Sequence, residues 1–445
     1  MNHQDTIVAL ATPAGSGAIA VIRISGNEAR AIAASVFKAK NKKSLLNQPS
    51  HSILLGTVTD GKRIIDEVLA SVFINPKSYT GEDTVEFSCH GSPYIQQEVI
   101  QLLLRKGCRH AKPGEFTLRA FLNGKMDLSQ AEAVADIIAS DNEAAHQVAI
   151  QQMRGGFSNE LAKLREELLN FASLIELELD FAEEDVEFAN REQFEALLHK
   201  IEKVLKKLID SFATGNVIKN GIPVAIAGAP NAGKSTLLNA LLNEERAIVS
   251  DIAGTTRDAI EDELSIGGIG FRFIDTAGIR DTIDTIESIG ISKTYEKINQ
   301  ARLVLFLVDA NDYKNNLEIL EVEINKIKNK YPQKQVLLIA NKTDLLSDEN
   351  IQILTKKFPN AILISALKQD GIEQLKEKLL SLVNTGALSS GDTVVTNARH
   401  YDSLNKALEE IKKVQSGLKN NLSGDLLAID IRQALYYFGE ITGQV

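Results

Sequence analysis

Gly228-Ala-Pro-Asn-Ala-Gly-Lys-Ser235 is the stretch that decides the fold. It follows an apolar run at residues 222–227, which is typical of a buried strand, and it opens a helical pattern at residues 236–242. A glycine-rich turn in this context directs backbone N–H groups at phosphate oxygens. Lys234 can then reach the β and γ phosphates, and the Ser235 hydroxyl can bind Mg²⁺. We therefore predict a nucleotide phosphate loop rather than a glycine-rich turn that precedes a helix by chance.

Two further motifs indicate which base is bound. Asn341-Lys-Thr-Asp344 ends the apolar run at 336–340, and Asp344 can accept two hydrogen bonds from the N–H edge that guanine has and adenine lacks. A site built on such bonds discriminates by roughly 10⁴ or more. Ser365-Ala-Leu367 follows another apolar run and can complete the pocket with a backbone N–H. The predicted base is guanine.

The same strand-and-helix alternation defines the surrounding domain. Asp275-Thr-Ala-Gly278 also follows an apolar run, where its carboxylate can hold the metal through water and its glycine can meet the γ phosphate. Apolar runs alternate with helical patterns throughout residues 220–380, which is typical of a doubly wound sheet. We predict a P-loop, Ras-like α/β G domain over these residues that hydrolyses GTP.

The residue that orients the attacking water is not evident from the motifs alone. Switch GTPases often place a glutamine after Asp-x-x-Gly, but Ile279 stands at that position here. The following segment offers Asp281, Asp284 and Glu287, which taken singly are typical of solvated loop carboxylates.

A positive charge near the γ phosphate is also needed. Asn231, together with backbone carbonyls of residues 250–256, could hold a monovalent cation in place of an arginine finger. Asparagine after proline is also a common turn residue, and spacing alone does not separate these two alternatives. Thr256 would supply a hydroxyl to Mg²⁺ in the triphosphate state, which would make this segment the switch.

The G domain interrupts sequence of a different character. Residues 1–118 mix short β-rich runs with helical stretches, which predicts a compact α+β domain. Residues 119–219 carry apolar residues at three- and four-residue spacing, which is typical of amphipathic helices. Residues 381–445 return to that periodicity but are too few to bury a core alone. We predict a multidomain α+β and α/β chain in which these two segments form one helical domain with the G domain inserted.

Composition restricts the partners and the compartment. The net charge of −10 argues against broad nonspecific affinity for nucleic acid. Cys89 and Cys108 are too few for a disulfide framework, and we expect both to be buried core thiols. Neither a signal segment nor an apolar run of the roughly 20 residues that cross a bilayer is present, so we expect a cytoplasmic protein without membrane contact.

The motifs together resemble those of the tRNA modification GTPase family MnmE, also called TrmE. The resemblance covers essentially the whole chain. Besides the phosphate loop and residues 275–280, it rests on Asp251-Ile-Ala-Gly-Thr-Thr-Arg-Asp258, Glu287-Ser-Ile-Gly290, Asp5-Thr-Ile-Val-Ala-Leu-Ala-Thr-Pro13, Arg23-Ile-Ser-Gly26, Tyr79-Thr-Gly-Glu-Asp83, His90-Gly91, Pro113-Gly-Glu-Phe-Thr-Leu-Arg-Ala-Phe-Leu-Asn123 and Lys125.

For the G domain, the resemblance implies a K⁺-stimulated GTPase. Ligands to K⁺ would be Asn231, Ser250, Ile252 and Thr255, while Ser235 and Thr256 would bind Mg²⁺. The catalytic residues would be Glu287, which orients the water, Lys234 and Thr256. The expected GTP and GDP site comprises Asn231, Ala232, Gly233, Lys234, Ser235, Thr236, Ser250, Asp251, Ile252, Ala253, Gly254, Thr255, Thr256, Asp275, Thr276, Ala277, Gly278, Asn341, Lys342, Thr343, Asp344, Ser365, Ala366 and Leu367.

For the remainder of the chain, the resemblance implies an N-terminal domain that forms the homodimer and binds a tetrahydrofolate one-carbon derivative, 5-formyl- or 5,10-methylene-tetrahydrofolate. Arg23, Glu86 and Lys125 match its binding positions. A flavin-dependent partner, MnmG (GidA), would form a heterotetramer that contacts tRNA and installs an aminomethyl or carboxymethylaminomethyl group at C5 of the wobble uridine.

Two other functions are weighed against this one. A ribosome-assembly GTPase would bind rRNA through an appended domain, and such a domain should be basic. A folate-dependent aminomethyltransferase acting in its own right would leave the G domain unexplained. The family also ends in Cys-x-Gly-Lys, whereas this sequence ends in Gly439-Glu-Ile-Thr-Gly-Gln-Val445, so we expect it to stop short of that motif and assign no terminal cysteine or lysine.

Overall fold

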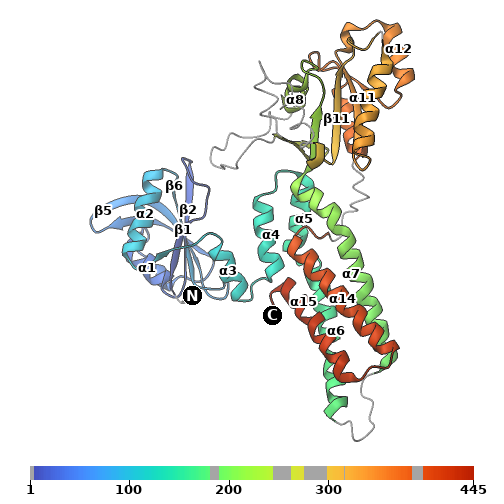
Figure 1. Cartoon of the computed structure of the whole chain (residues 1–445). Coiled ribbons are helices and arrows are strands. Elements are labelled where there is room, and N and C mark those ends of the chain that lie inside the picture. The colour runs from blue at the N-terminus through green and yellow to red at the C-terminus, as the bar shows by residue number, and fades with distance from the viewer. Residues whose placement is uncertain are drawn as a thin grey trace. The chain divides into compact units, whose positions relative to one another are not determined.

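The computed structural model describes residues 5–180, 190–243, 262–274, 298–314, 316–382 and 394–444 (Figure 1). These residues fall into two compact units, of which the first ends at Ala135. In these described parts of the chain, no helix combines the length and the apolar character needed to span a bilayer.

The first unit is an α+β domain, as predicted. Its sheet has seven strands in the order β3-β4-β5-β6-β2-β1-β7. Apolar residues alternate along the central strands, and their inward set packs against helices on one face. The elements are β1 (Ile7–Leu10), β2 (Ile19–Ser25), α1 (Ala29–Val36), β3 (Phe37–Ala39), β4 (Ser52–Asp60), β5 (Arg63–Phe73), β6 (Thr84–His90), α2 (Pro93–Arg105), β7 (Arg109–His110), α3 (Glu115–Leu122) and α4 (Leu128–Ile138), which crosses the unit boundary.

Both cysteines lie in this core, which confirms the prediction of buried thiols. The exposed fractions are 2% for Cys89 and 7% for Cys108. Burial raises the pKa of the Cys89 thiol to about 11 and that of Cys108 to about 12. Because the thiolate is the reactive form, neither residue is activated as a nucleophile at neutral pH.

The helical part of the second unit contains both the earlier and the last helices of the chain. They are α5 (Glu143–Met153), α6 (Ser158–Asp180), α7 (Arg191–Asn220), α14 (Ala398–Lys419) and α15 (Gly424–Thr442). Figure 1 shows α14 and α15 lying along α6 and α7, and one buried cluster joins all four helices. The prediction that the C-terminal residues pack on the earlier helices is therefore confirmed.

The chain re-enters the helical part through a fixed contact. Gln152 donates from Nε2 to the carbonyl of Val394 at 3.1 Å and to the Thr396 hydroxyl at 3.0 Å. The N–H of Val395 donates to the Ser211 hydroxyl at 3.1 Å. These bonds hold the segment that leads into α14.

The remaining part of the second unit is a doubly wound domain, also as predicted. Its six-stranded sheet has the order β13-β12-β11-β8-β10-β9, and all neighbouring strands run parallel except β9, which is antiparallel to β10. Buried clusters cover both faces. The elements are β8 (Ile222–Ala227), α8 (Lys234–Asn243), β9 (Asp262–Ile266), β10 (Ile269–Phe273), β11 (Leu303–Asp309), α11 (Leu317–Lys330), β12 (Gln335–Asn341), α12 (Asp348–Lys357), β13 (Ile362–Leu363) and α13 (Ile372–Leu382).

Candidate functional site

The predicted phosphate loop lies between the end of β8 and the start of α8. Lys234 is the first residue of that helix, and its ammonium donates to the carbonyls of Gly228 at 2.8 Å and Ala229 at 2.9 Å. Asn231 has a φ of 66°, a left-handed conformation that asparagine adopts more readily than most residues. The loop therefore curls around the Lys234 side chain at the N-terminus of α8, where backbone N–H groups favour an anion.

A buried amide, Asn341, ties this loop to the predicted base pocket. Its Nδ2 donates to the carbonyl of Ala232 at 2.8 Å, and its Oδ1 accepts the N–H of Ala366 at 2.9 Å. Gly233 has a φ of 97°, and a Cβ there would lie 2.3 Å from Asn341 Nδ2. Glycine is thus required at this position by both conformation and space.

The residues predicted to bind the base lie where β12 and β13 end side by side. A hydrogen bond from the Ser365 hydroxyl is the main cause that lowers the pKa of Asp344, and Lys368 lies 3.5 Å from the same carboxylate. Asp344 is therefore ionised at neutral pH, as an acceptor for the guanine N–H edge must be. Leu367 is 82% exposed, which leaves its side chain available to a flat base.

Lys342 and Thr343 complete the described part of this site. Lys342 has a φ of 62°, and its ammonium lies 2.7 Å from Oδ2 of Asp309 at the end of β11. The Thr343 hydroxyl donates to the carbonyl of Ile364 at 3.0 Å. The ends of three neighbouring parallel strands are thereby joined by side chains of the Asn341–Asp344 motif.

The other half of the predicted nucleotide site lies outside the described residues. This applies to the segment at 250–256 with its proposed K⁺ and Mg²⁺ ligands, to residues 275–278, and to Glu287. Their roles remain predictions.

A second group of predicted residues lies in the first unit. Arg23 on β2 and Glu86 on β6 are opposite in register, and Arg23 Nε donates to Glu86 Oε1 at 2.7 Å. Their side chains are 23% and 22% exposed. The guanidinium also lies 5.1 Å from the ring centre of Tyr79 and 5.3 Å from that of Phe116. Arg23 is thus held between one carboxylate and two aromatic rings.

Lys125, the third predicted folate residue, lies against the loop that carries Tyr79. Its ammonium donates to the carbonyl of Pro76 at 2.9 Å, and a Cβ placed on Gly81 would lie 3.3 Å from its Cγ. Tyr79 and Phe116 both stand in the quoted family motifs, but sequence reasoning gave them no role. Both rings lie far from Arg23 in the sequence. No periodic pattern of residues therefore indicates that they contact its side chain.

A buried ion-pair network lies behind this site. Arg119 is 1% exposed and donates to Asp5 at 2.8 Å, to Glu82 at 3.1 Å and to Glu115 at 3.2 Å. The neighbouring Arg109 is the main reason why the pKa of Glu115 falls to about 2. The network fixes Glu82 and, with it, the loop that presents the Tyr79 ring.

The doubly wound sheet, with the predicted phosphate loop and the predicted guanine-recognition motif at its carboxyl edge, is that of a P-loop GTPase. Residues 6–125 match the family model of the GTP-binding protein TrmE N-terminus, and residues 128–445 match that of the MnmE helical domain. The chain belongs to the MnmE (TrmE) family of tRNA modification GTPases.

Individual relatives agree with the family models. The tRNA modification GTPase MnmE of Christiangramia forsetii is 69% identical over 457 residues, which cover 100% of this chain and 96% of that protein. The one from Bacteroides thetaiotaomicron is 52% identical over 451 residues, with the same two shares. Among solved structures, the FeoB G-domain from Methanococcus jannaschii is 30% identical to this chain. The match covers 36% of this chain and 94% of that one, with a TM-score of 0.25.

Family membership makes this chain a GTP hydrolase that uses a guanine nucleotide with Mg²⁺. The match of residues 6–125 to the TrmE N-terminus does not favour the ribosome-assembly alternative.

Proposed function

We propose that this chain, together with a flavoprotein partner, MnmG (GidA), couples K⁺-stimulated GTP hydrolysis to a tRNA modification in which the folate gives up its one-carbon unit as the C5 methylene group, an amine co-substrate supplies the nitrogen, and tetrahydrofolate is released. The product is an aminomethyl or carboxymethylaminomethyl group at C5 of the wobble uridine, and the complex works in the cytoplasm as a heterotetramer. Residues 1–118 form the folate-binding domain, 119–219 with 381–445 the helical domain, and 220–380 the G domain.

The observation that carries this proposal is the environment of Arg23. A pterin is a flat ring with N–H donors along one edge, and folates also carry carboxylates. The Tyr79 and Phe116 rings offer a flat apolar surface, Glu86 offers an acceptor, and Arg23 offers a cation. A one-carbon tetrahydrofolate, 5-formyl- or 5,10-methylene-tetrahydrofolate, fits this combination of groups.

Titration of the full chain with 5-formyltetrahydrofolate tests the proposal. We expect saturable binding, and Arg23→Met should weaken it by roughly 10- to 100-fold because a charge-assisted contact is lost. Arg63→Met is the matched control: Arg63 lies on β5 of the same sheet, pairs with Glu98 at 2.9 Å and is half exposed, so its loss should leave affinity unchanged. Absence of binding to the unaltered chain would remove the one-carbon part of the proposal.

The open face of the first unit supports the homodimer. Leu55 on β4 and Leu69 on β5 are directly opposite in register and are each 44% exposed, and Ile53 beside them is 64% exposed. A second copy of the chain covering these side chains would remove them from water. Sedimentation of the folate-titrated samples at two protein concentrations measures this association, and a monomer at both would count against the dimer.

At the G domain, we propose that Lys234 and Thr256 stabilise the γ phosphate while Glu287 orients the attacking water. Ser235 and Thr256 supply hydroxyls to Mg²⁺, and K⁺ is held by Asn231 with Ser250, Ile252 and Thr255. Bound K⁺ supplies the positive charge that an arginine finger provides elsewhere.

The Glu287 role has a direct test. Glu287→Ala should lower GTP turnover by on the order of 10²-fold or more, because an unoriented water rarely attacks in line, while nucleotide affinity persists. Turnover and affinity are measured on the same preparation. If affinity disappears with turnover, Glu287 has a structural role instead.

A further inference from the structure

The tip of the β9–β10 hairpin contacts the first turn of α5. The N–H of Ala144, the second residue of that helix, donates to the carbonyl of Gly268 at 3.0 Å. The N–H groups of a first turn have no acceptor within their own helix, so the hairpin carbonyl satisfies one of them. Asn142 caps the same turn, because its Oδ1 accepts the N–H of Ala145 at 2.9 Å.

Glycines allow this close approach. Gly268 has a φ of 78°, and a Cβ there would lie 3.4 Å from the Cβ of Glu143. A Cβ on Gly270 would lie only 2.9 Å from Asn142 Nδ2, so any other residue would displace that side chain. The hairpin tip is therefore shaped to the N-terminus of α5.

The opposite end of the hairpin reaches the predicted nucleotide site. β10 pairs in parallel with β8, with Phe271 opposite Ile222 and Phe273 opposite Val224, and β8 leads directly into the phosphate loop. In the sequence, β9 follows the predicted switch at 250–256, and β10 ends just before Asp275. The hairpin is thus the stretch of chain between the two segments predicted to sense the γ phosphate.

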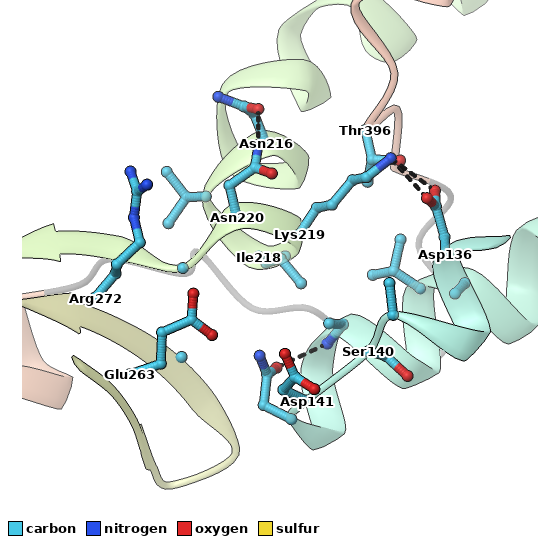
Figure 2. Close-up of a pocket in the computed structure, with 18 of the residues that line it drawn as sticks. Asp136, Ser140, Asp141, Asn216, Ile218, Lys219, Asn220, Glu263, Arg272 and Thr396 are labelled. Atoms are coloured by element: carbon cyan, nitrogen blue, oxygen red, sulfur yellow. Dashed lines mark hydrogen bonds and ion pairs between the residues drawn. The ribbon is translucent and has the colours of Figure 1, made fainter. Parts of the chain in front are cut away.

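A cavity of about 790 Å³ lies beside this contact. Its lining includes Glu263 and Arg272 of the hairpin, Asp141 just before α5, and Lys219 and Asn220 at the end of α7, which Figure 2 shows around the pocket. Close-packed interfaces resist the displacement of one element against another, whereas open space beside a contact allows such a displacement. A shift of the hairpin can therefore move the first turn of α5 without disrupting a packed core.

We propose that this contact couples the state of the bound nucleotide to the helical domain. Asn142 and Ala144 are positioning residues: neither touches the nucleotide, and they act by holding the hairpin tip. The proposal rests on the GTPase function of the G domain. The free energy of a single hydrogen bond with its adjoining contact corresponds to a roughly fivefold to tenfold change in the opening equilibrium of the first turn of α5 between the two nucleotide states.

Hydrogen exchange of the full chain with GDP and with a non-hydrolysable GTP analogue tests the coupling. We expect exchange in the first turn of α5 to differ by about fivefold between the two nucleotides. Ala144→Pro removes the donor to Gly268, and proline is tolerated in a first turn, so this difference should fall below about twofold. GTP affinity and turnover should stay within about twofold of the unaltered chain, because the change is remote from the nucleotide.

Two further sets of variants distinguish the loss of this contact from a general destabilisation of the fold. Glu192→Pro places proline at the equivalent, second position of the exposed start of α7 and should leave the difference intact. Gly270→Ala should abolish the difference by displacing Asn142. Adding Asn142→Ser to Gly270→Ala should restore it, because serine caps a helix as well as asparagine but is shorter.

The outcomes that overturn the proposal are distinct from failure of the GTPase assignment. The proposal fails if α5 exchange is the same with both nucleotides, if Ala144→Pro keeps the full difference, or if Asn142→Ser does not rescue Gly270→Ala. Should Ala144→Pro not fold, the Gly270 pair decides alone. Only a chain that binds no GTP at all would count against the function of the G domain.

Discussion

The two predicted sites of this chain are built in different ways. The nucleotide site lies at the carboxyl edge of a parallel sheet, where backbone groups and the buried Asn341 hold neighbouring loops together. The Arg23 site lies on a mostly antiparallel sheet, where separate side chains converge and a buried network centred on Arg119 supports them. Local motifs therefore specify the first site, whereas the second depends on packing behind it.

The largest effect is expected when the predicted base-binding residues are altered. Asp344→Ala removes the acceptor for the guanine N–H edge, so the preference for GTP over ATP should fall by up to about 10⁴-fold. Competition binding of the two nucleotides measures this preference. Asp348→Ala in the exposed first turn of α12 is the control, and a preference kept by the Asp344 variant would mean that guanine is read elsewhere.

Exchange of the alkali cation probes the same site without a mutation. If Asn231 holds K⁺ as proposed, GTP turnover should drop by on the order of 10²-fold when Na⁺ replaces K⁺, because one preorganised stabilising charge is lost. Initial rates at constant ionic strength measure the effect, with 5-formyltetrahydrofolate binding as a readout that should not change. Equal rates in the two salts would leave Asn231 as a turn residue.

A smaller effect is expected in the network behind the Arg23 site. Arg109 lowers the pKa of Glu115 from 4.5 to about 2, so this carboxylate stabilises the fold above pH 4.5 and loses that contribution as the pH falls towards 2. Glu115→Gln should lower the free energy of unfolding by on the order of 3 kcal/mol at pH 7, and by less at pH 3. Denaturant unfolding at both pH values measures the difference.

A matched exposed pair provides the control for that prediction. Glu67 is 46% exposed and pairs with Lys40, which is 61% exposed, so Glu67→Gln should change the free energy of unfolding by less than about 1 kcal/mol. If Glu115→Gln behaved like this control at both pH values, the buried network would not be what supports the Arg23 site.

Most of the fold followed from periodicity. The apolar runs at 222–227 and 336–340 placed β8 and β12 to within one residue, and the apolar stripe predicted the packing of the last helices on α6 and α7. The roles of Tyr79, Phe116 and Arg119 could not be predicted in this way. Each acts through neighbours far along the chain, and in sequence Arg119 is an ordinary charged residue on a short helix.

The sequence alone was enough to predict the strand-turn-helix elements, the phosphate loop and the preference for guanine, because these depend on backbone geometry and on residues a few positions apart. Only the tertiary structure placed Arg23 between Glu86 and two rings, buried the charges around Arg119, and set the hairpin tip against Ala144. Such arrangements depend on long-range register and burial, which bring together groups that no local pattern connects.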